Sequence, residues 1–314
     1  MTNNGTRNSP RKSGDVAVPV RHRAEFAAFQ LFKWAVLALP LKSAQRLGSS
    51  LGSLAWYLLG VRREVALDNL RQAFPEKSDK EREVIARGSF RNAGITLAEL
   101  LWFPNLTDAI LHDLITLRNP EIMTDAYRRG KGLIMLSGHF GNWELVALGA
   151  AHLTGIPFAV VVQTQSNLLV DRVINRHRCL FGNTVIPKGM SVREILTILH
   201  EGRVVAIAPD QSGPMEGVFV DFFGRSVATH QGPAAFALKT GSPVQIGFMI
   251  RRPDGRYDVV LEEVESGDLA GGEEGILELT RRHTALLERY IRQYPDHWLW
   301  MHRRWKHTWE SVHA

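Results

Sequence analysis

The sequence predicts an α/β protein: a mixed, largely parallel central sheet flanked by helices, with an apolar helical segment at the N-terminus. Short apolar runs recur along the chain, and longer stretches with helical periodicity lie between them. Strands separated by helices of this length are typical of βαβ units, whose strands run parallel. The N-terminal segment is predicted by two further apolar runs, at residues 26–41 and 47–61, which carry almost no charge.

The composition of the 314 residues, 45% hydrophobic and 22% charged, is that of a folded protein. It excludes a disordered, collagen-like or disulfide-stapled chain. The single cysteine, Cys179, permits no intrachain disulfide and suits a reducing compartment.

The positive charge of the chain is concentrated at its N-terminus. Residues 1–46 contain eight Lys and Arg against two Asp and Glu, a net charge of +6, which equals the net charge of the whole chain. A basic end indicates an anionic partner, either nucleic acid or phospholipid headgroups. The apolar runs that accompany the charge favour lipid.

Residues 1–20 have the composition of a disordered tail, and residues 21–61 are predicted to associate with a membrane as helices. A membrane-spanning helix needs about 20 apolar residues, and neither apolar run is that long without a charge. The late start of the apolar region also argues against a cleavable signal. We therefore expect a helix or helical pair lying in the membrane interface. A buried helical hairpin and a single tilted membrane helix are the alternatives.

Residues 62–314 are predicted to form one domain. Its first expected helix lies at 81–101 and a long helix is expected at 273–294, both supported by apolar residues at helical spacing. Between these, the expected strands are 133–136, 157–162, 204–208 and 244–249, and the expected helices are 143–153, 168–180, 192–201 and 231–240. A turn-like segment at 253–256 predicts a strand pair formed by 245–251 and 257–262.

The residues that can carry chemistry are concentrated at 137–144, directly after the first of these strands. Ligands of α/β proteins bind at such strand-to-helix turns, and Gly138 and Gly141 allow a sharp turn there. His139 and Glu144 can meet only if the histidine lies on the loop and the glutamate on the first helical turn. A carboxylate contact would make the imidazole a better base. The alternative is a capping histidine beside a surface glutamate.

This motif resembles the H-x4-D/E signature of the glycerolipid-type acyltransferases. Within that superfamily, the chain is most similar to the bacterial lipid A biosynthesis acyltransferases, the late enzymes that add lauroyl- or myristoyl-type secondary chains. The similarity extends over nearly the whole chain from about residue 26. Its blocks lie at residues 68–70, 73–76, 137–144, 208–211, 222–224 with Thr229, 241–244 and 294–306.

The resemblance implies a membrane-associated acyltransferase of lipid A and lipopolysaccharide biosynthesis at the cytoplasmic face of the cell inner membrane. Its donor would be a thioester of acyl carrier protein or coenzyme A, and its acceptor a hydroxyl of a phosphorylated glycolipid such as a lipid A precursor. His139 would be the general base and Glu144 would orient it. No covalent acyl-enzyme, cofactor or metal is implied, so Cys179 need not act as a nucleophile.

The resemblance also implies four substrate-binding residues. Arg178 matches an important arginine of the family, with Arg176 as the second choice, and either could hold a phosphate or a developing oxyanion. Asn167 lies in the same block, and Asp210 matches an acidic position that would order the site through hydrogen bonds. Gln163 stands where many family members have an arginine.

The C-terminal stretch, residues 297–313, combines four tryptophans with histidines and basic residues. It lacks a spaced set of metal ligands, and we expect its tryptophans at the edge of the core or at the membrane rather than on nucleic acid bases. Two other functions are considered: a lysophospholipid or phosphatidylinositol-mannoside acyltransferase, and a non-catalytic lipid-binding protein. Contact between His139 and Glu144 at a pocket would favour an enzyme, and their separation by more than a hydrogen bond would favour a non-catalytic binding protein.

Overall fold

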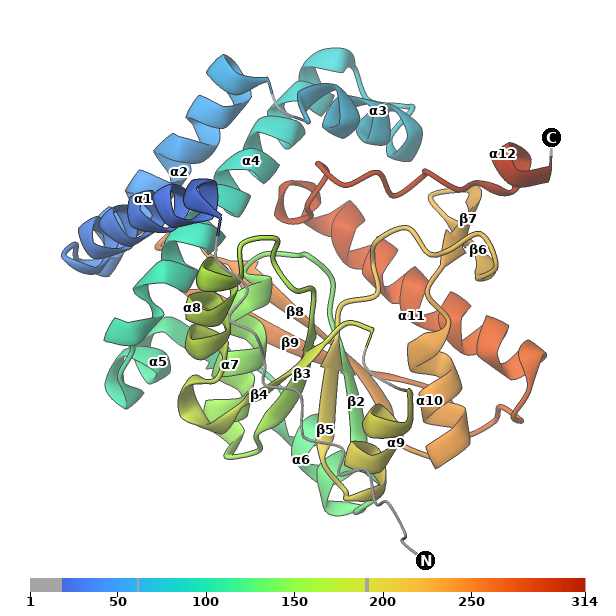
Figure 1. Ribbon diagram of the computed structural model, residues 1–314. Helices are drawn as coiled ribbons and strands as arrows, with labels where there is room; N and C mark the ends of the chain where they lie inside the picture. The colour runs from blue at the N-terminus through green and yellow to red at the C-terminus, as the bar shows by residue number, and fades with distance from the viewer. Residues whose placement is uncertain (1–18, 61, 190–191, 314) are drawn as a thin grey trace, which may run out of the picture.

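The computed structural model describes residues 19–60, 62–189 and 192–313, and its centre is a mixed β-sheet (Figure 1). Within these residues the sheet has seven strands in the order β1-β9-β8-β2-β5-β3-β4. Neighbouring strands are parallel, except for the antiparallel pair β8 and β9. The predicted α/β class, with a mixed and largely parallel central sheet, is therefore confirmed. The strands are β1 (Ile115–Leu117), β2 (Leu133–Leu136), β3 (Phe158–Val162), β4 (Thr184–Pro187), β5 (Val204–Ile207), β8 (Val244–Arg251) and β9 (Tyr257–Val264).

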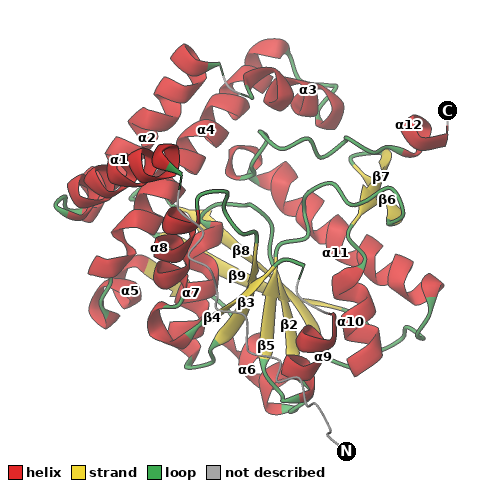
Figure 2. Cartoon of the chain, viewed as in Figure 1, coloured by secondary structure: helices red, strands yellow, loops and turns green. Residues whose placement is uncertain are grey.

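Helices cover both faces of this sheet (Figure 2). The alternating side chains of β2 show the two layers: Ile134 and Leu136 belong to one apolar cluster, and Leu133 and Met135 to the other. The first cluster includes residues of α9, α10 and α11, and the second includes residues of α5, α6 and α7. These helices are α5 (Asp108–Leu114), α6 (Pro120–Arg128), α7 (Trp143–Thr154), α9 (Val192–His200), α10 (Gly232–Thr240) and α11 (Glu273–Gln293).

The N-terminal segment is helical, as predicted, and part of it packs on the domain. Glycines make close packing possible between α2 (Leu41–Leu54) and α4 (Asp79–Trp102). A Cβ atom on Gly48 would lie 2.5 Å from the carbonyl oxygen of Gly94, and one on Gly52 would lie 2.2 Å from that of Phe90. The packing of α2 on α4 is what the alternative of a buried helical hairpin predicts for this part of the segment. The predicted tail at residues 1–20 lies almost wholly outside the described residues.

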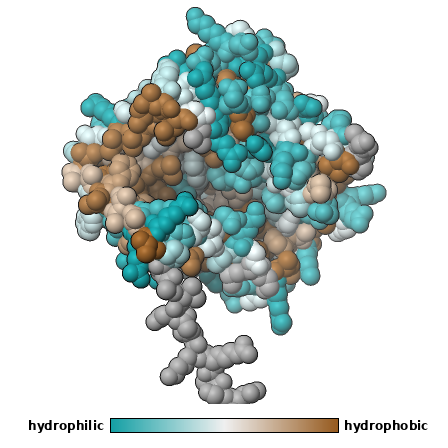
Figure 3. Space-filling model, turned by 45° about the horizontal axis from the view of Figure 1, so that its top comes forward, coloured by the Kyte–Doolittle hydropathy of each residue, from teal (hydrophilic) through white to brown (hydrophobic). Residues whose placement is uncertain are grey.

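The outer surface of the same segment exposes large apolar side chains. Among the described residues, no helix is both long enough and apolar enough to cross a membrane. Exposed apolar residues instead lie on α1 (Val20–Leu37), on α2 and on the π-helical turn η1 (Ala55–Leu59). Figure 3 shows apolar surface gathered on the side of the molecule where these helices lie. We call this the N-terminal apolar surface: Leu31, Phe32, Trp34, Leu51, Leu54, Tyr57, Leu58 and Leu59.

Several short elements were not predicted. They include β1, β4, α5 and α6, together with α3 (Arg63–Ala73) and a separate antiparallel hairpin of β6 (Val218–Phe222) and β7 (Arg225–Thr229). The helix predicted at 168–180 ends two residues earlier, as α8 (Leu168–Arg178). The last residues of the C-terminal stretch form a short helix, α12 (Trp309–His313). Trp298, Trp300 and Trp305 of this stretch are buried in the core, whereas Trp309 is half exposed.

Candidate active site

Two neighbouring strands deliver the central residues of the site. Strands β2 and β5 pair in parallel, from Leu133 with Val204 to Leu136 with Ile207. Their carboxyl ends therefore lie at the same edge of the sheet, where α/β proteins bind ligands. His139 follows β2 by three residues and Asp210 follows β5 by three residues.

The loop that carries His139 needs a glycine at 141 and is tightly packed at Gly138. Gly141 has φ +58°, and a Cβ atom there would lie 1.7 Å from the carbonyl oxygen of Met249. A Cβ atom on Gly138 would lie 2.9 Å from a methyl carbon of Leu287. The C-terminal stretch also holds the loop, because the backbone N–H of Leu299 donates to the carbonyl of His139 at 2.9 Å. These contacts fix the backbone of the loop from which the imidazole projects.

Asp210 contacts His139 twice. Its Oδ1 lies 2.8 Å from Nδ1 of the imidazole, and its Oδ2 accepts the backbone N–H of His139, also at 2.8 Å. The indole N–H of Trp298 donates to the same Oδ2 at 2.9 Å. The Asp210 side chain is only 2% exposed, whereas that of His139 is 24% exposed. The carboxylate therefore holds one ring nitrogen and leaves Nε2 available to a substrate.

The two groups shift each other's pKa. Burial alone would lower the pKa of His139, but the charge and hydrogen bond of Asp210, with a smaller effect of Glu144, raise it above its ordinary value of 6.5. Burial would raise the pKa of Asp210, yet the charge and hydrogen bonds of His139 and the bond from Trp298 lower it to about 2. Asp210 is therefore ionised at neutral pH and stabilises a protonated His139.

The expected contact between Glu144 and His139 is not formed. His139 does lie on the loop and Glu144 on the first turn of α7, but within the described part of the chain the glutamate bonds to Arg178 instead. Nε and an Nη of the guanidinium donate to the two carboxylate oxygens at 2.8 and 2.7 Å. A guanidinium fork matches a carboxylate better than a single imidazole N–H does. The carboxylate that bonds to His139 is thus that of Asp210, and Glu144 acts on His139 through its charge. The separation of Glu144 from His139 therefore does not leave the imidazole without a carboxylate partner.

Of the other predicted binding residues, only Arg178 lies at the cavity of His139. Arg178 is largely buried, and its contact with Glu144 outweighs burial and raises its pKa. Arg176 is exposed, so Arg178 is the better placed of the two. Asn167 caps α8 and donates to the carbonyl of His22 and to Glu25 on α1, at 2.9 and 3.1 Å. In this structure Asn167 therefore joins two helices.

His139, Glu144 and Arg178 line one cavity of about 520 Å³. Gln211 and Lys188 also line it, and apolar residues of the sheet, of α7 and of α10 make up much of its surface. A largely apolar pocket with a few convergent polar groups is typical of a small-molecule site. The apolar wall includes Met135, Val146, Ala150, Phe158, Val160 and Leu261.

Sequence reasoning missed two residues of this site. The side-chain nitrogen of Gln211 lies 3.5 Å from Nε2 of His139. The indole N–H of Trp298 donates a hydrogen bond to Asp210. Gln211 follows Asp210 directly in a block that the resemblance already marked. No local pattern, however, connects Trp298 with a residue 88 positions earlier.

An imidazole that is hydrogen-bonded to a carboxylate can act as a general base, and the largely apolar cavity beside it can hold the fatty chain of a substrate. The comparison with known sequences defines the class further, because a profile described as bacterial lipid A biosynthesis acyltransferase matches residues 15–307. The chain belongs to this family and is an acyltransferase.

Curated relatives are similar over most of their own length. A lipid A biosynthesis lauroyltransferase of Escherichia coli K12 is 28% identical over 287 residues, 89% of this chain and 90% of the relative. A lipid A biosynthesis palmitoleoyltransferase of the same strain is 26% identical and covers 87% and 88% of the two chains. A lipid A biosynthesis acyltransferase of Haemophilus influenzae is 25% identical over 86% of each.

Proposed function

We propose that the protein transfers a fatty acyl chain from a thioester, of acyl carrier protein or coenzyme A, to a hydroxyl of a phosphorylated lipid A precursor. The observation that carries this proposal is the His139–Asp210 pair at the edge of a largely apolar cavity. Family membership supports the acyl chemistry and the lipid A acceptor.

In the proposed step, Nε2 of His139 takes the proton of the acceptor hydroxyl. The hydroxyl oxygen forms a bond to the thioester carbon, and the tetrahedral intermediate then breaks its carbon–sulfur bond. The leaving thiolate receives the proton from His139, which restores the neutral imidazole. Asp210 holds the tautomer and stabilises the imidazolium, as the carboxylate of a hydrolase triad does. No acyl group becomes bound to the protein.

The cations of the cavity suit the charges of these substrates. The bonds to Glu144 and to Oδ1 of Asn175 fix the plane of Arg178, whose guanidinium has five N–H groups. We assign Arg178 and Lys188 to an acceptor phosphate or to the phosphate of the donor's arm. The amide of Gln211 is placed to donate to the developing oxyanion beside His139.

An assay with purified protein tests the acceptor. Acyl carrier protein or coenzyme A loaded with one fatty acid is offered with a lipid A precursor, a lysophospholipid or a phosphatidylinositol mannoside, and products are identified by mass spectrometry. We expect one acyl chain to be added to the lipid A precursor, because the chain belongs to the lipid A biosynthesis acyltransferase family. Acylation of only another acceptor would transfer the function to that lipid. Binding of the lipids without any transfer would support a non-catalytic lipid-binding protein.

We further propose that the N-terminal apolar surface lies in the membrane interface at the cytoplasmic face of the inner membrane, where thioester donors are available. Its aromatic residues have cations beside them, as interfacial anchors do: the Lys33 ammonium lies 5.0 Å from the centre of the Trp34 ring, and the Arg87 guanidinium 5.0 Å from that of Tyr57. Leu58 and Leu59 are 74% and 65% exposed.

Leu58→Asp is expected to weaken binding to anionic phospholipid vesicles roughly ten- to a hundredfold, because a fully buried leucine is worth about 1.5–3 kcal/mol. Co-sedimentation with vesicles measures the effect. Leu277→Asp is the matched control, since Leu277 is an exposed leucine on α11, outside this surface. Equal loss of binding in both variants, or in neither, would place the membrane contact elsewhere.

A further inference from the structure

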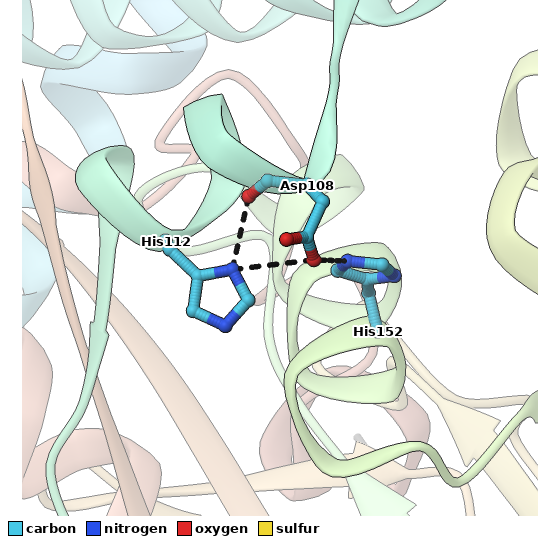
Figure 4. A group of neighbouring side chains, drawn as sticks. All are labelled: Asp108, His112 and His152. Carbon is cyan, nitrogen blue, oxygen red and sulfur yellow. Dashed lines mark hydrogen bonds and ion pairs between the residues drawn. The ribbon is translucent and has the colours of Figure 1, made fainter.

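Three side chains that commonly bind metals converge on the surface between α5 and α7, outside the cavity of the active site. Asp108 and His112 lie one turn apart on α5, and His152 lies on the last turn of α7 (Figure 4). Oδ1 of Asp108 is 3.3 Å from Nδ1 of His112 and 2.8 Å from Nε2 of His152. One ligand atom from each residue lies within 4.8 Å of the other two.

We propose that these residues bind one divalent transition metal ion of the zinc class. Two imidazole nitrogens and one carboxylate oxygen are a ligand set that Zn²⁺ takes in proteins, with water as the fourth ligand. Zinc–ligand bonds of about 2.0–2.2 Å place tetrahedral ligand atoms about 3.3–3.6 Å apart. The Asp108–His112 separation already has this value, whereas the ligand atoms of Asp108 and His152 would have to move apart from 2.8 Å, so the side chains must rotate to admit the ion.

Local structure holds two of the ligands in place. Thr107 caps α5 and places Asp108 at its first position, so that His112 follows on the same face. The imidazole of His152 packs on Phe181, with ring centres 4.5 Å apart. His112 Nδ1 also lies 2.9 Å from the carbonyl oxygen of Asp108, and an ion bound to that nitrogen would replace this hydrogen bond.

A bound ion would join α5 and α7 through Asp108 and His152, which are 44 positions apart in the chain. Asp108 and His112 are 72% and 60% exposed, so the ion can enter from solvent and keep a water ligand. The opposite end of α7 carries Asn142 and Glu144 of the active-site motif. The site would therefore fix the helix that begins at the catalytic loop.

Zinc binding to the untagged, full-length protein tests this inference. In competition with a zinc-chelating dye, we expect one Zn²⁺ per chain at this site and at least tenfold weaker binding in His112→Ala and His152→Gln. Glutamine keeps a donor for Asp108 and so preserves the contact between the helices. Zn²⁺ should also raise the melting temperature of the unsubstituted protein more than that of either variant.

Two controls separate this site from other histidines. His200→Ala removes an exposed histidine of α9 and should bind zinc normally. His139→Ala reports zinc held at the active site. The inference is wrong if His112→Ala and His152→Gln bind zinc as tightly as the unsubstituted protein does, or if the single binding event disappears only in His139→Ala.

Discussion

His139→Ala should lower kcat/KM for acyl transfer by about 10²–10⁴-fold, the usual loss when a general base is removed. The effect follows from the position of the imidazole, which Asp210 holds at Nδ1 while Nε2 remains available at the cavity. Alanine leaves the acceptor hydroxyl without a group that can take its proton. Steady-state kinetics with a thioester donor and a lipid A precursor measure the loss.

His200→Ala is the matched control, because it removes an exposed histidine outside the cavity. It should keep full activity. The melting temperature of His139→Ala shows whether the variant is folded. Near-native turnover by folded His139→Ala would mean that another group removes the proton.

Asp210→Asn should reduce kcat/KM by up to about 10⁴-fold, as when an amide replaces the orienting carboxylate of a triad. Asparagine has nearly the same shape but no charge and only one acceptor oxygen, so it can neither stabilise the imidazolium nor accept from both N–H groups of His139, which bond to different oxygens of Asp210. The indole N–H of Trp298 also loses a charged acceptor. The same kinetic assay measures this loss.

Glu144→Gln is the matched comparison, since it neutralises the other carboxylate near His139. Glu144 bonds to Arg178, so its loss should act on substrate binding more than on the imidazole. We therefore expect a smaller loss of kcat than in Asp210→Asn. The reverse order would restore Glu144 as the residue that orients the base.

The fold was largely predictable because its central strands are short apolar runs between periodic helices. The runs at 133–136 and 204–208 correspond to β2 and β5. Strand β1 has only three residues, and β4 has four with two of them exposed, so neither produces a clear apolar signal. Periodicity also says nothing about strand order, which depends on how the layers pack.

Because the sequence does not reveal the strand order, it predicts Glu144 and not Asp210 as the partner of His139. The sequence places Glu144 five positions away and Asp210 71 positions away, and spacing favours the nearer residue. Only the pairing of β2 with β5 brings Asp210 to the imidazole. Both residues do follow predicted parallel strands at their carboxyl ends, and this was the available signal. Arg178 then takes the carboxylate that spacing assigned to His139.

The pH dependence of kcat/KM in the unsubstituted protein and in Asp210→Asn tests the His139–Asp210 pair most directly. Activity should rise with pH as His139 loses its proton, with a midpoint above 6.5 because Asp210 stabilises the charged form. In Asp210→Asn this stabilisation is absent while burial still disfavours the imidazolium, so the midpoint should move to lower pH. An unchanged midpoint would contradict the assignment of Asp210 as the partner of the catalytic base.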